Sequence, residues 1–228
     1  MLNAIVNRRL DEVFHIGRGV GANRVGGSLE EDEACRLAAS WMEEAGLEVE
    51  VDRRGNLVGR LMGARPELPE VWTGSHLDSV PRGGRFDGAL GVVAGLEAVS
   101  ALGRAERTLG AVVFRDEETG CHGSRWRARN AALPGSYVEL HVEQGPVLAD
   151  ADAPLGVVSS IAGIVRAERE FFGKADHAGT TPMGGRRDAL VEAARYVVRV
   201  EEQARAIDGA VATVGELEVH PGAANVVP

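Results

Sequence analysis

The sequence predicts an α/β protein with a mixed, largely parallel sheet flanked by helices, followed by part of a smaller α+β domain. Up to about residue 160, short apolar segments typical of strands alternate with segments that have helical spacing. Beyond that point a single long amphipathic helix lies between extended segments. The 228 residues are 44% apolar, which is enough for a substantial core. We therefore expect one domain over residues 1–160 and a second over residues 161–228.

The first predicted helix covers residues 28–45. Ser28 and Glu31 have the spacing of a capping box, in which the two residues satisfy free N–H groups at a helix start. Apolar residues then recur every three or four positions. Gly46 follows the last turn, where glycine often ends a helix.

The rest of the first domain alternates between strand and helix patterns. The glycine and alanine content of one helix, residues 88–102, indicates that it packs closely against its neighbour. The expected strands are a hairpin over 47–52 and 55–63, then 71–73, 109–114 and 137–142.

The second domain contains three predicted segments. Residues 164–182 form an extended run that leads to a turn, and residues 186–206 form an amphipathic helix. Residues 209–228 resemble another strand and a loop. One helix and about two strands do not close a sheet well, so this domain is expected to be incomplete.

Composition excludes some functional classes. The net charge of −9 argues against nucleic acid as a partner, because phosphate binding needs basic patches. Two cysteines, Cys35 and Cys121, are too few for a disulfide framework and indicate a reducing compartment. The first residues lack the apolar core of a signal peptide, and no apolar run approaches the roughly 20 residues of a membrane span. We expect a cytoplasmic protein without a membrane partner.

Imidazoles and carboxylates follow three of the predicted strands. Because parallel strands end at the same edge of a sheet, we expect these groups to gather there. Such ligands without thiolates are typical of a site for a divalent metal such as zinc or manganese. The groups are His76, Asp78 and Asp87 after the first of these strands, Asp116, Glu117 and Glu118 after the second, and His141, Glu143 and Gln144 at the third.

The spacing of these groups suggests separate tasks. His76 can bind a metal while Asp78 holds its other ring nitrogen. Asp87 lies in a glycine-rich stretch that lets its carboxylate approach or bridge ions. Glu117 and Glu118 are adjacent and diverge, so one can ligate while the other acts as a general base.

Each of these features has an ordinary alternative. A lone histidine near an aspartate or a pair of glutamates is more often a solvated surface feature, and His141 alone would more often be a buried strand residue. Their joint occurrence at three strand ends favours the metal site. His122 and Cys121 are expected in a loop, and His15 and His220 have no partner near them in the sequence.

Five sequence blocks resemble the hydantoinase/carbamoylase family of amidohydrolases. This family includes N-carbamoyl-L-amino acid hydrolases and allantoate amidohydrolases, and it is related to the zinc aminopeptidases and aminoacylases. The resemblance runs from about Ser28 to Pro228 and implies a zinc-peptidase-like catalytic domain followed by a smaller lid or dimerisation domain. The blocks are TGSHLDSVPRGGRFDGALGV, FRDEE, YVELHVEQGPVL, ADHAGTTPMGGRRDA and PGAANVVP.

The resemblance implies a site with two divalent metal ions, zinc, manganese, cobalt or nickel. His76 and His141 would bind the first metal, Asp87 would bridge both, and Glu118 would bind the second.

The resemblance also implies catalytic and substrate-binding roles. Glu117 would be the general base and Asp78 would orient the first metal-binding histidine. His177, from the second domain, would stabilise the oxyanion across a dimer interface and contact the substrate. Asn225 and Gln144 would also contact the substrate.

The implied activity is metal-dependent hydrolysis of C–N bonds in linear amides, with N-carbamoyl-L-amino acids or allantoate-like ureido acids as small-molecule substrates and a homodimer as the assembly. An aminoacylase or dipeptidase of the same superfamily is one alternative. The other is an inactive, truncated remnant that acts only through dimerisation. Family chains continue beyond the position of Pro228 with an arginine and a last metal-binding histidine, and many have a longer segment where this chain has residues 119–140.

Overall fold

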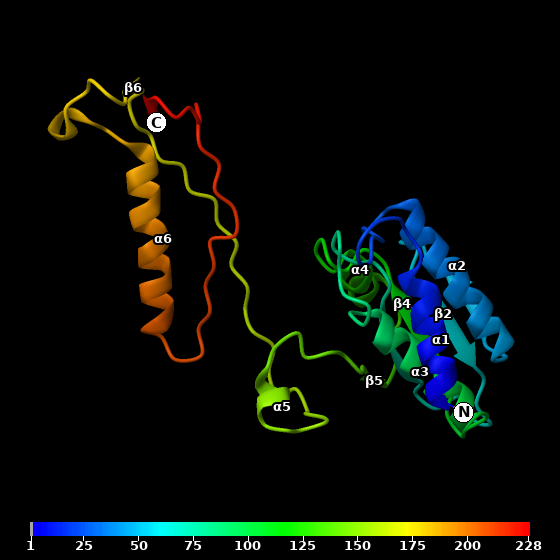
Figure 1. The fold of residues 1–228 in the computed structure, drawn as a ribbon. Coiled ribbons are helices and arrows are strands. Elements are labelled where there is room, and N and C mark those ends of the chain that lie inside the picture. The colour runs from blue at the N-terminus through cyan, green and yellow to red at the C-terminus, as the bar shows by residue number, and fades with distance from the viewer. Residues whose placement is uncertain (1) are drawn as a thin grey trace. The chain divides into compact units, whose positions relative to one another are not determined.

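The structure is a computed structural model that describes residues 2–228 (Figure 1). The chain divides into two compact units, the first ending at Val157 and the second spanning Val158–Pro228. The change in sequence pattern near residue 160 therefore lies close to the point where the units separate.

The first unit contains a five-stranded mixed sheet in the order β1-β2-β4-β3-β5. The central strand β3 runs parallel to both β4 and β5, whereas β1 and β2 form an antiparallel hairpin that pairs with β4 through β2. This arrangement confirms the predicted α/β class. The strands are β1 (Glu48–Val51), β2 (Leu57–Leu61), β3 (Val71–His76), β4 (Leu109–Phe114) and β5 (Ser136–Val138).

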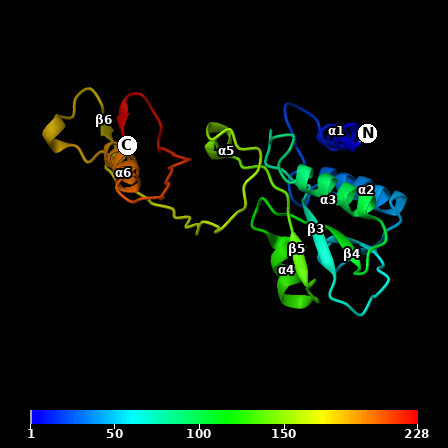
Figure 2. The ribbon, with the colours of Figure 1, turned by 90° about the horizontal axis from the view of Figure 1, so that it is seen from below.

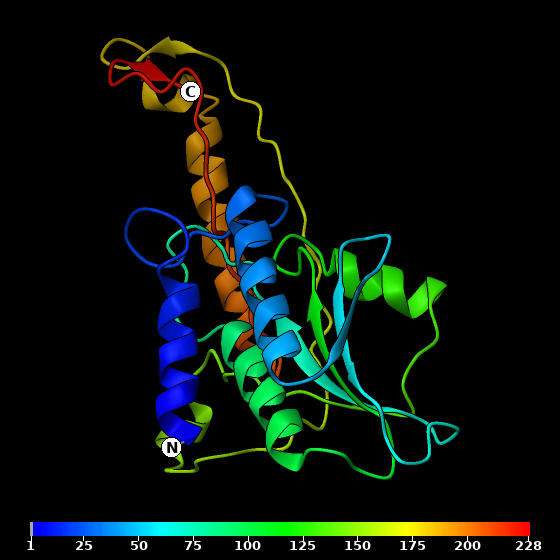
Figure 3. The same ribbon diagram turned by 90° about the vertical axis from the view of Figure 1, so that its right-hand side faces the viewer.

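Helices cover the two faces of this sheet unequally. Figures 2 and 3 show α1 (Leu2–Phe14), α2 (Leu29–Glu44) and α3 (Ala89–Leu102) on one face and α4 (His122–Asn130) on the other. The larger hydrophobic core lies under the first three helices. A smaller cluster of Val58, Trp72 and Val112, with Phe114 packed against it, occupies the face that α4 covers.

Helix α2 begins as its sequence predicts. The Ser28 hydroxyl accepts the N–H of Glu31 at 3.2 Å. The carboxylate of Glu31 accepts the N–H of Gly27 at 2.7 Å, one residue earlier than in the usual capping box. Gly46 follows the helix at φ +80°, a left-handed conformation that glycine adopts without strain.

Helix α3 packs directly against β3 because its facing residues are glycines. A Cβ atom at Gly91 would lie 2.8 Å from the Cβ of Ser75, and one at Gly95 would lie 2.8 Å from the hydroxyl of Thr73. This close packing confirms the prediction for the small-residue helix. It also places the residues just before α3 against the end of β3.

The structure corrects several expected elements. Residues 122–130 form a helix where a loop was expected, because this polar segment has no apolar periodicity to reveal it. The strand expected over 137–142 is Ser136–Val138, and His141 follows it in an irregular segment. A further short helix, α5 (Val147–Asp150), lies before the end of the first unit.

The second unit combines an amphipathic helix with a minimal sheet. Helix α6 (Ala189–Arg205) is capped by the side chain of Asp188, which accepts the N–H of Val191 at 3.0 Å. Strands β6 (Asp176–His177) and β7 (Val226–Val227) pair antiparallel, and a 3-10 turn covers Met183–Gly185. The longer strands expected here are therefore wrong, since these extended segments have no pairing partner among the described residues. Within residues 2–228 none of the helices has the length and apolar character needed to cross a lipid bilayer.

Candidate metal centre and adjoining pocket

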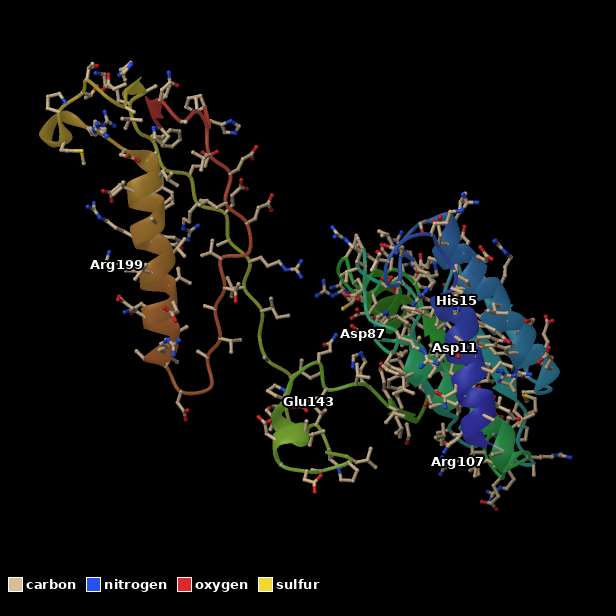
Figure 4. All side chains as sticks on the ribbon, in the orientation of Figure 1. Asp11, His15, Asp87, Arg107, Glu143 and Arg199 are labelled. Atoms are coloured by element: carbon tan, nitrogen blue, oxygen red, sulfur yellow. The ribbon has the colours of Figure 1, made fainter. Side chains whose placement is uncertain are left out.

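Two histidines and an aspartate meet at the end of β3. His76 is the last residue of β3, Asp87 lies just before α3, and His141 follows β5. One potential ligand atom from each lies within 4.8 Å of the others. The Asp87 Oδ1 atom is 3.3 Å from Nε2 of His141 and 4.0 Å from Nε2 of His76. Figure 4 labels Asp87 in the first unit.

The environment of Asp87 suits a cation. Its Oδ2 atom accepts a hydrogen bond from Nε2 of Gln144 at 2.5 Å. Its Oδ1 atom is buried and has no hydrogen-bond partner among the described residues, which is costly for a carboxylate oxygen. Two atoms that bind one ion at about 2.0–2.2 Å lie at most about 4.4 Å apart, and both pairs that include Oδ1 of Asp87, at 3.3 Å and 4.0 Å, meet this limit. The donor set therefore fits a divalent metal ion.

Asp78 sets the orientation of the His76 ring. The imidazole is buried, with 3% exposure, and its Nδ1 lies 3.1 Å from the backbone oxygen of Asp78 and 3.3 Å from Oδ1 of the same residue. A proton on Nδ1 would therefore be held by Asp78. The other nitrogen, Nε2, then faces Asp87 and Glu117 with its lone pair free for a metal.

The surrounding carboxylates change the pKa of His76. Burial lowers this pKa, but the hydrogen bond to Asp78 and the charges of Asp78, Glu117 and Asp87 outweigh burial and raise it to about 9. Burial alone would raise the pKa of Asp78, yet hydrogen bonds from His76 and two backbone N–H groups hold it below its usual value. This negative pocket favours a positive charge at the imidazole, either a proton or a metal.

The two adjacent glutamates have different surroundings. Oε2 of Glu117 lies 3.8 Å from Nε2 of His76, and its Oε1 accepts a hydrogen bond from the thiol of Cys121 at 3.2 Å. Glu118 is not part of the three-residue group. Burial raises the pKa of Glu118. The positive charge of His76 opposes this shift, and the negative charges of neighbouring carboxylates add to it. Glu117 is therefore the carboxylate that faces the ring of His76.

Glu31 is a buried residue of α2 that binds the loop after β4, and sequence analysis missed this role. Its Oε1 atom accepts the N–H of Asp116 at 2.8 Å, and its Oε2 atom lies 2.9 Å from the Arg115 guanidinium. Asp116 has φ +52°, a left-handed conformation that few residues other than glycine, asparagine and aspartate adopt. Only its capping role was visible in the sequence, because the contact joins residues 85 positions apart.

Gly88 is required where Asp87 approaches His76. It has φ +62°, and a Cβ atom there would lie 2.5 Å from the backbone oxygen of His76 and 2.6 Å from its ring. A side chain at position 88 would therefore separate α3 from the end of β3.

Other predicted groups lie elsewhere. The carboxylate of Glu143 accepts the N–H groups of Val147 and Leu148, each at 2.8 Å, and so caps α5 (Figure 4). His177 and Asn225 are neighbours in the second unit, where the N–H of Ala178 donates to the backbone oxygen of Asn225 at 2.9 Å.

Among the described residues, two further histidines contact only groups close to them in the sequence. His15, just after α1, is exposed, and its Nδ1 atom is 2.6 Å from the backbone oxygen of Asp11 (Figure 4). His220 is exposed beside Glu218, with 3.3 Å between Nε2 and the carboxylate. Neither belongs to the three-residue group at the end of β3.

A cavity of about 450 Å³ adjoins the three-residue group. His76, Glu117 and His141 lie on its wall, so it opens where the candidate ligands meet. The remaining wall comes from β3, the end of β4, α4 and the segments in and around β5, including Trp72, Phe114, Arg127, Leu133, Tyr137 and Glu139. A separate cavity of about 390 Å³ near the start of α2 shares none of these residues.

Comparison with known sequences gives a consistent family relationship. The family model for peptidase family M20/M25/M40 matches residues 72–224. An N-carbamoyl-L-amino acid amidohydrolase of Geobacillus stearothermophilus is 39% identical over 97% of this chain and 66% of its own length. Allantoate deiminase 1 of Glycine max is 33% identical over 86% of this chain and 55% of its own length. This chain therefore spans somewhat more than half of the length of these relatives.

A solved structure supports the same relationship. The amidase of the hydantoinase/carbamoylase family from Burkholderia vietnamiensis superposes with a TM-score of 0.74 at 29% identity, over 98% of this chain and 65% of that one. The alignment with the Geobacillus stearothermophilus protein contains more positions than this chain has residues, so that relative has residues inside the aligned region that are absent here. That the missing residues correspond to the short segment 119–140 stays a prediction.

Proposed function

The chain belongs to peptidase family M20/M25/M40, and on this basis we propose that it is a metal-dependent amidohydrolase that cleaves C–N bonds in linear amides. Its substrates would be N-carbamoyl-L-amino acids or allantoate-like ureido acids, on which relatives with these names act. The observation that carries the proposal is the buried Oδ1 atom of Asp87, which has no hydrogen-bond partner among the described residues and lies within 4.0 Å of the Nε2 atoms of His76 and His141.

We assign the metal ligands to residues of the first unit. His76, Asp87 and His141 would hold one ion, and Glu118 would contribute to a second. When bound, the metal supplies an acidified water molecule and polarises the scissile carbonyl. Zinc, manganese, cobalt and nickel all suit imidazole and carboxylate ligands.

The chain's own groups would position and move protons. Asp78 would keep His76 in the tautomer that leaves Nε2 free. Glu117 would take a proton from water through Oε2, while Cys121 holds Oε1. Water adds to the carbamoyl carbon, the bond to the amino nitrogen breaks, and that nitrogen takes the proton. The products are an amino acid and carbamate, which decomposes to ammonia and carbon dioxide.

The second unit would complete the site. We propose that His177 stabilises the oxyanion and that Asn225 contacts the substrate, together with Gln144 of the first unit. We also propose a homodimer through this unit. Its extended segments expose apolar side chains such as Val165, Phe172 and Val211, which a partner could cover. The mass of the purified chain in solution, measured by light scattering, tests this assembly.

The activity is tested by product analysis. The metal-loaded chain is incubated with N-carbamoyl-L-alanine, N-acetyl-L-alanine or a dipeptide, and ammonia, acetate and free amino acid are measured. Ammonia release from the carbamoyl substrate that is lost in Glu117→Gln supports the proposal. Release of acetate or of a dipeptide's amino acid without ammonia would assign an aminoacylase or dipeptidase instead, and no hydrolysis with any metal would contradict an enzymatic role for this chain.

A further inference from the structure

We propose that the cavity beside the metal group binds an uncharged, apolar side chain of the substrate. The chain would then prefer N-carbamoyl amino acids with aromatic or large aliphatic side chains over allantoate-like ureido acids. This inference rests on the proposed function, because it names the substrate class of the same site.

The cavity and the metal group are continuous. His76 and His141, two of the three candidate ligands, form part of the cavity wall, and so does Glu117. A substrate whose carbonyl lies at the metal group can therefore place a neighbouring side chain in the cavity. The volume of about 450 Å³ lies within the range of small-molecule sites and exceeds that of a phenyl ring.

Apolar groups dominate the inner wall. Trp72 is buried, with 3% exposure, and forms part of the smaller hydrophobic cluster. The rings of Phe114 and Tyr137 lie 6.1 Å apart with a 58° angle between their planes. Leu133 adds an aliphatic surface. Aromatic rings in tilted arrangements offer both faces and edges to a further ring, so the wall suits an aromatic guest.

The charges around the cavity disfavour an anionic guest. Arg127 is the one arginine or lysine among the described residues of the wall, and it lies 3.2 Å from Asp52 and 4.7 Å from the ring of Trp72, so a carboxylate already neutralises it. Glu139 contributes a carboxylate that accepts the hydroxyl hydrogens of Ser75 and Tyr137. A substrate carboxylate in this cavity would face Glu139 and Glu117, which is unfavourable at short range. The substrate carboxylate must therefore point away from the cavity.

The first test compares substrates. The metal-loaded chain is assayed with N-carbamoyl-L-phenylalanine, N-carbamoylglycine and allantoate. Burial of a phenyl group predicts a kcat/KM about 30-fold higher for the phenylalanine derivative than for the glycine derivative. Ala128→Trp, at an exposed wall position of α4, should reduce the ratio of the two kcat/KM values to near one. Ala132→Trp, exposed and outside the cavity wall, is the matched control and should keep the preference.

A second variant and a binding measurement separate this inference from the proposed function. Leu133→Glu adds a charge to the cavity and should also remove the preference. Calorimetric titration of the metal-loaded Glu117→Gln variant should give a Kd about 30-fold lower for the phenylalanine derivative than for the glycine derivative. The second substitution Ala128→Trp should abolish this difference.

The outcomes are distinguishable. Equal hydrolysis of the phenylalanine and glycine derivatives would overturn the inference and leave the proposed function intact. Preferred hydrolysis of allantoate would also overturn it. Selective binding that Ala128→Trp abolishes, without any hydrolysis by the wild-type chain, would support the cavity and contradict the proposed function. If the chain shows no hydrolysis and no selective binding, both the inference and the proposed function are overturned.

Discussion

Asp78 holds the backbone of Glu118. The Oδ2 atom of Asp78 accepts the N–H of Glu118 at 2.9 Å, and its Oδ1 atom accepts the N–H of Glu117 at 3.1 Å. The same carboxylate lies 3.3 Å from Nδ1 of His76. One fully buried side chain therefore joins the end of β3 to the loop after β4, and couples the proposed metal ligand to the proposed base.

Replacement of this carboxylate tests the coupling. In Asp78→Asn the side-chain amide would face a backbone N–H group or Nδ1 of His76 with a donor where an acceptor is required. We expect the free energy of unfolding of the metal-free chain to fall by about 2 kcal/mol, measured by urea denaturation. We expect zinc affinity to fall by 10–100-fold (about 1.4–2.7 kcal/mol), measured by calorimetry. The exposed Asp150→Asn is the control, and equal zinc affinity in both variants would refute the coupling.

Glu31 and Asp78 together hold three consecutive N–H groups, those of Asp116, Glu117 and Glu118. Glu31→Gln keeps the size of the side chain but replaces one acceptor oxygen by a donor. We expect faster hydrogen exchange at these three amides, measured by mass spectrometry, and a loss of about 2 kcal/mol in unfolding free energy. Glu33→Gln, exposed on the same helix, should leave the exchange unchanged. Unchanged exchange in Glu31→Gln would show that this loop needs no support from α2.

Local signals explain why much of the fold was predictable. The periodicity of α2, its capping residue Ser28 and the small residues of α3 can each be recognised from residues that are close together in the sequence. The meeting of His76, Asp87 and His141 follows from the topology, because β3 and β5 run parallel and both candidate histidines lie at or beyond the same ends of their strands. Their roles at a metal stay predictions.

The contacts that were missed join distant positions or weak local patterns. The bond from Asp116 to Glu31 crosses 85 positions, and a single sequence contains no signal of such a pair. Helix α4 has a polar sequence and no side-chain cap, so neither periodicity nor capping reveals it. The cavity wall depends on α4, since Arg127 and its neighbours approach Trp72 only in the folded chain. Sequence analysis therefore identified chemical groups more readily than the space between them.

The buried thiol of Cys35 predicts a loss of stability at alkaline pH. Burial raises its pKa from 9.0 to about 11 in the folded chain, whereas the unfolded chain ionises near 9.0. The contribution of the protonated thiol to the stability of the fold is fully present below pH 9. It is lost as the pH rises toward 11, because the unfolded state releases the proton in this range before the folded state does. The difference in unfolding free energy between wild type and Cys35→Ala, measured by thermal melts, should be constant below pH 9. Between pH 9 and 11 it should change by up to roughly 3 kcal/mol, as the wild type loses stability. A constant difference over this range would contradict the raised pKa.

Gly88→Ala should disrupt the metal group without removing any ligand. The added Cβ atom would lie 2.5 Å from the backbone oxygen of His76, and the residue would keep a strained φ of +62°. We expect a loss of about 2–3 kcal/mol in unfolding free energy, because overpacking and left-handed strain both contribute. The cobalt-bound chain should lose its visible absorption bands or bind cobalt at least tenfold more weakly. Gly84→Ala is the matched control, since a Cβ atom there meets nothing within 4 Å, and its cobalt spectrum should match wild type. A wild-type cobalt spectrum and affinity in Gly88→Ala would show that Asp87 and His76 need no such close approach to bind a metal.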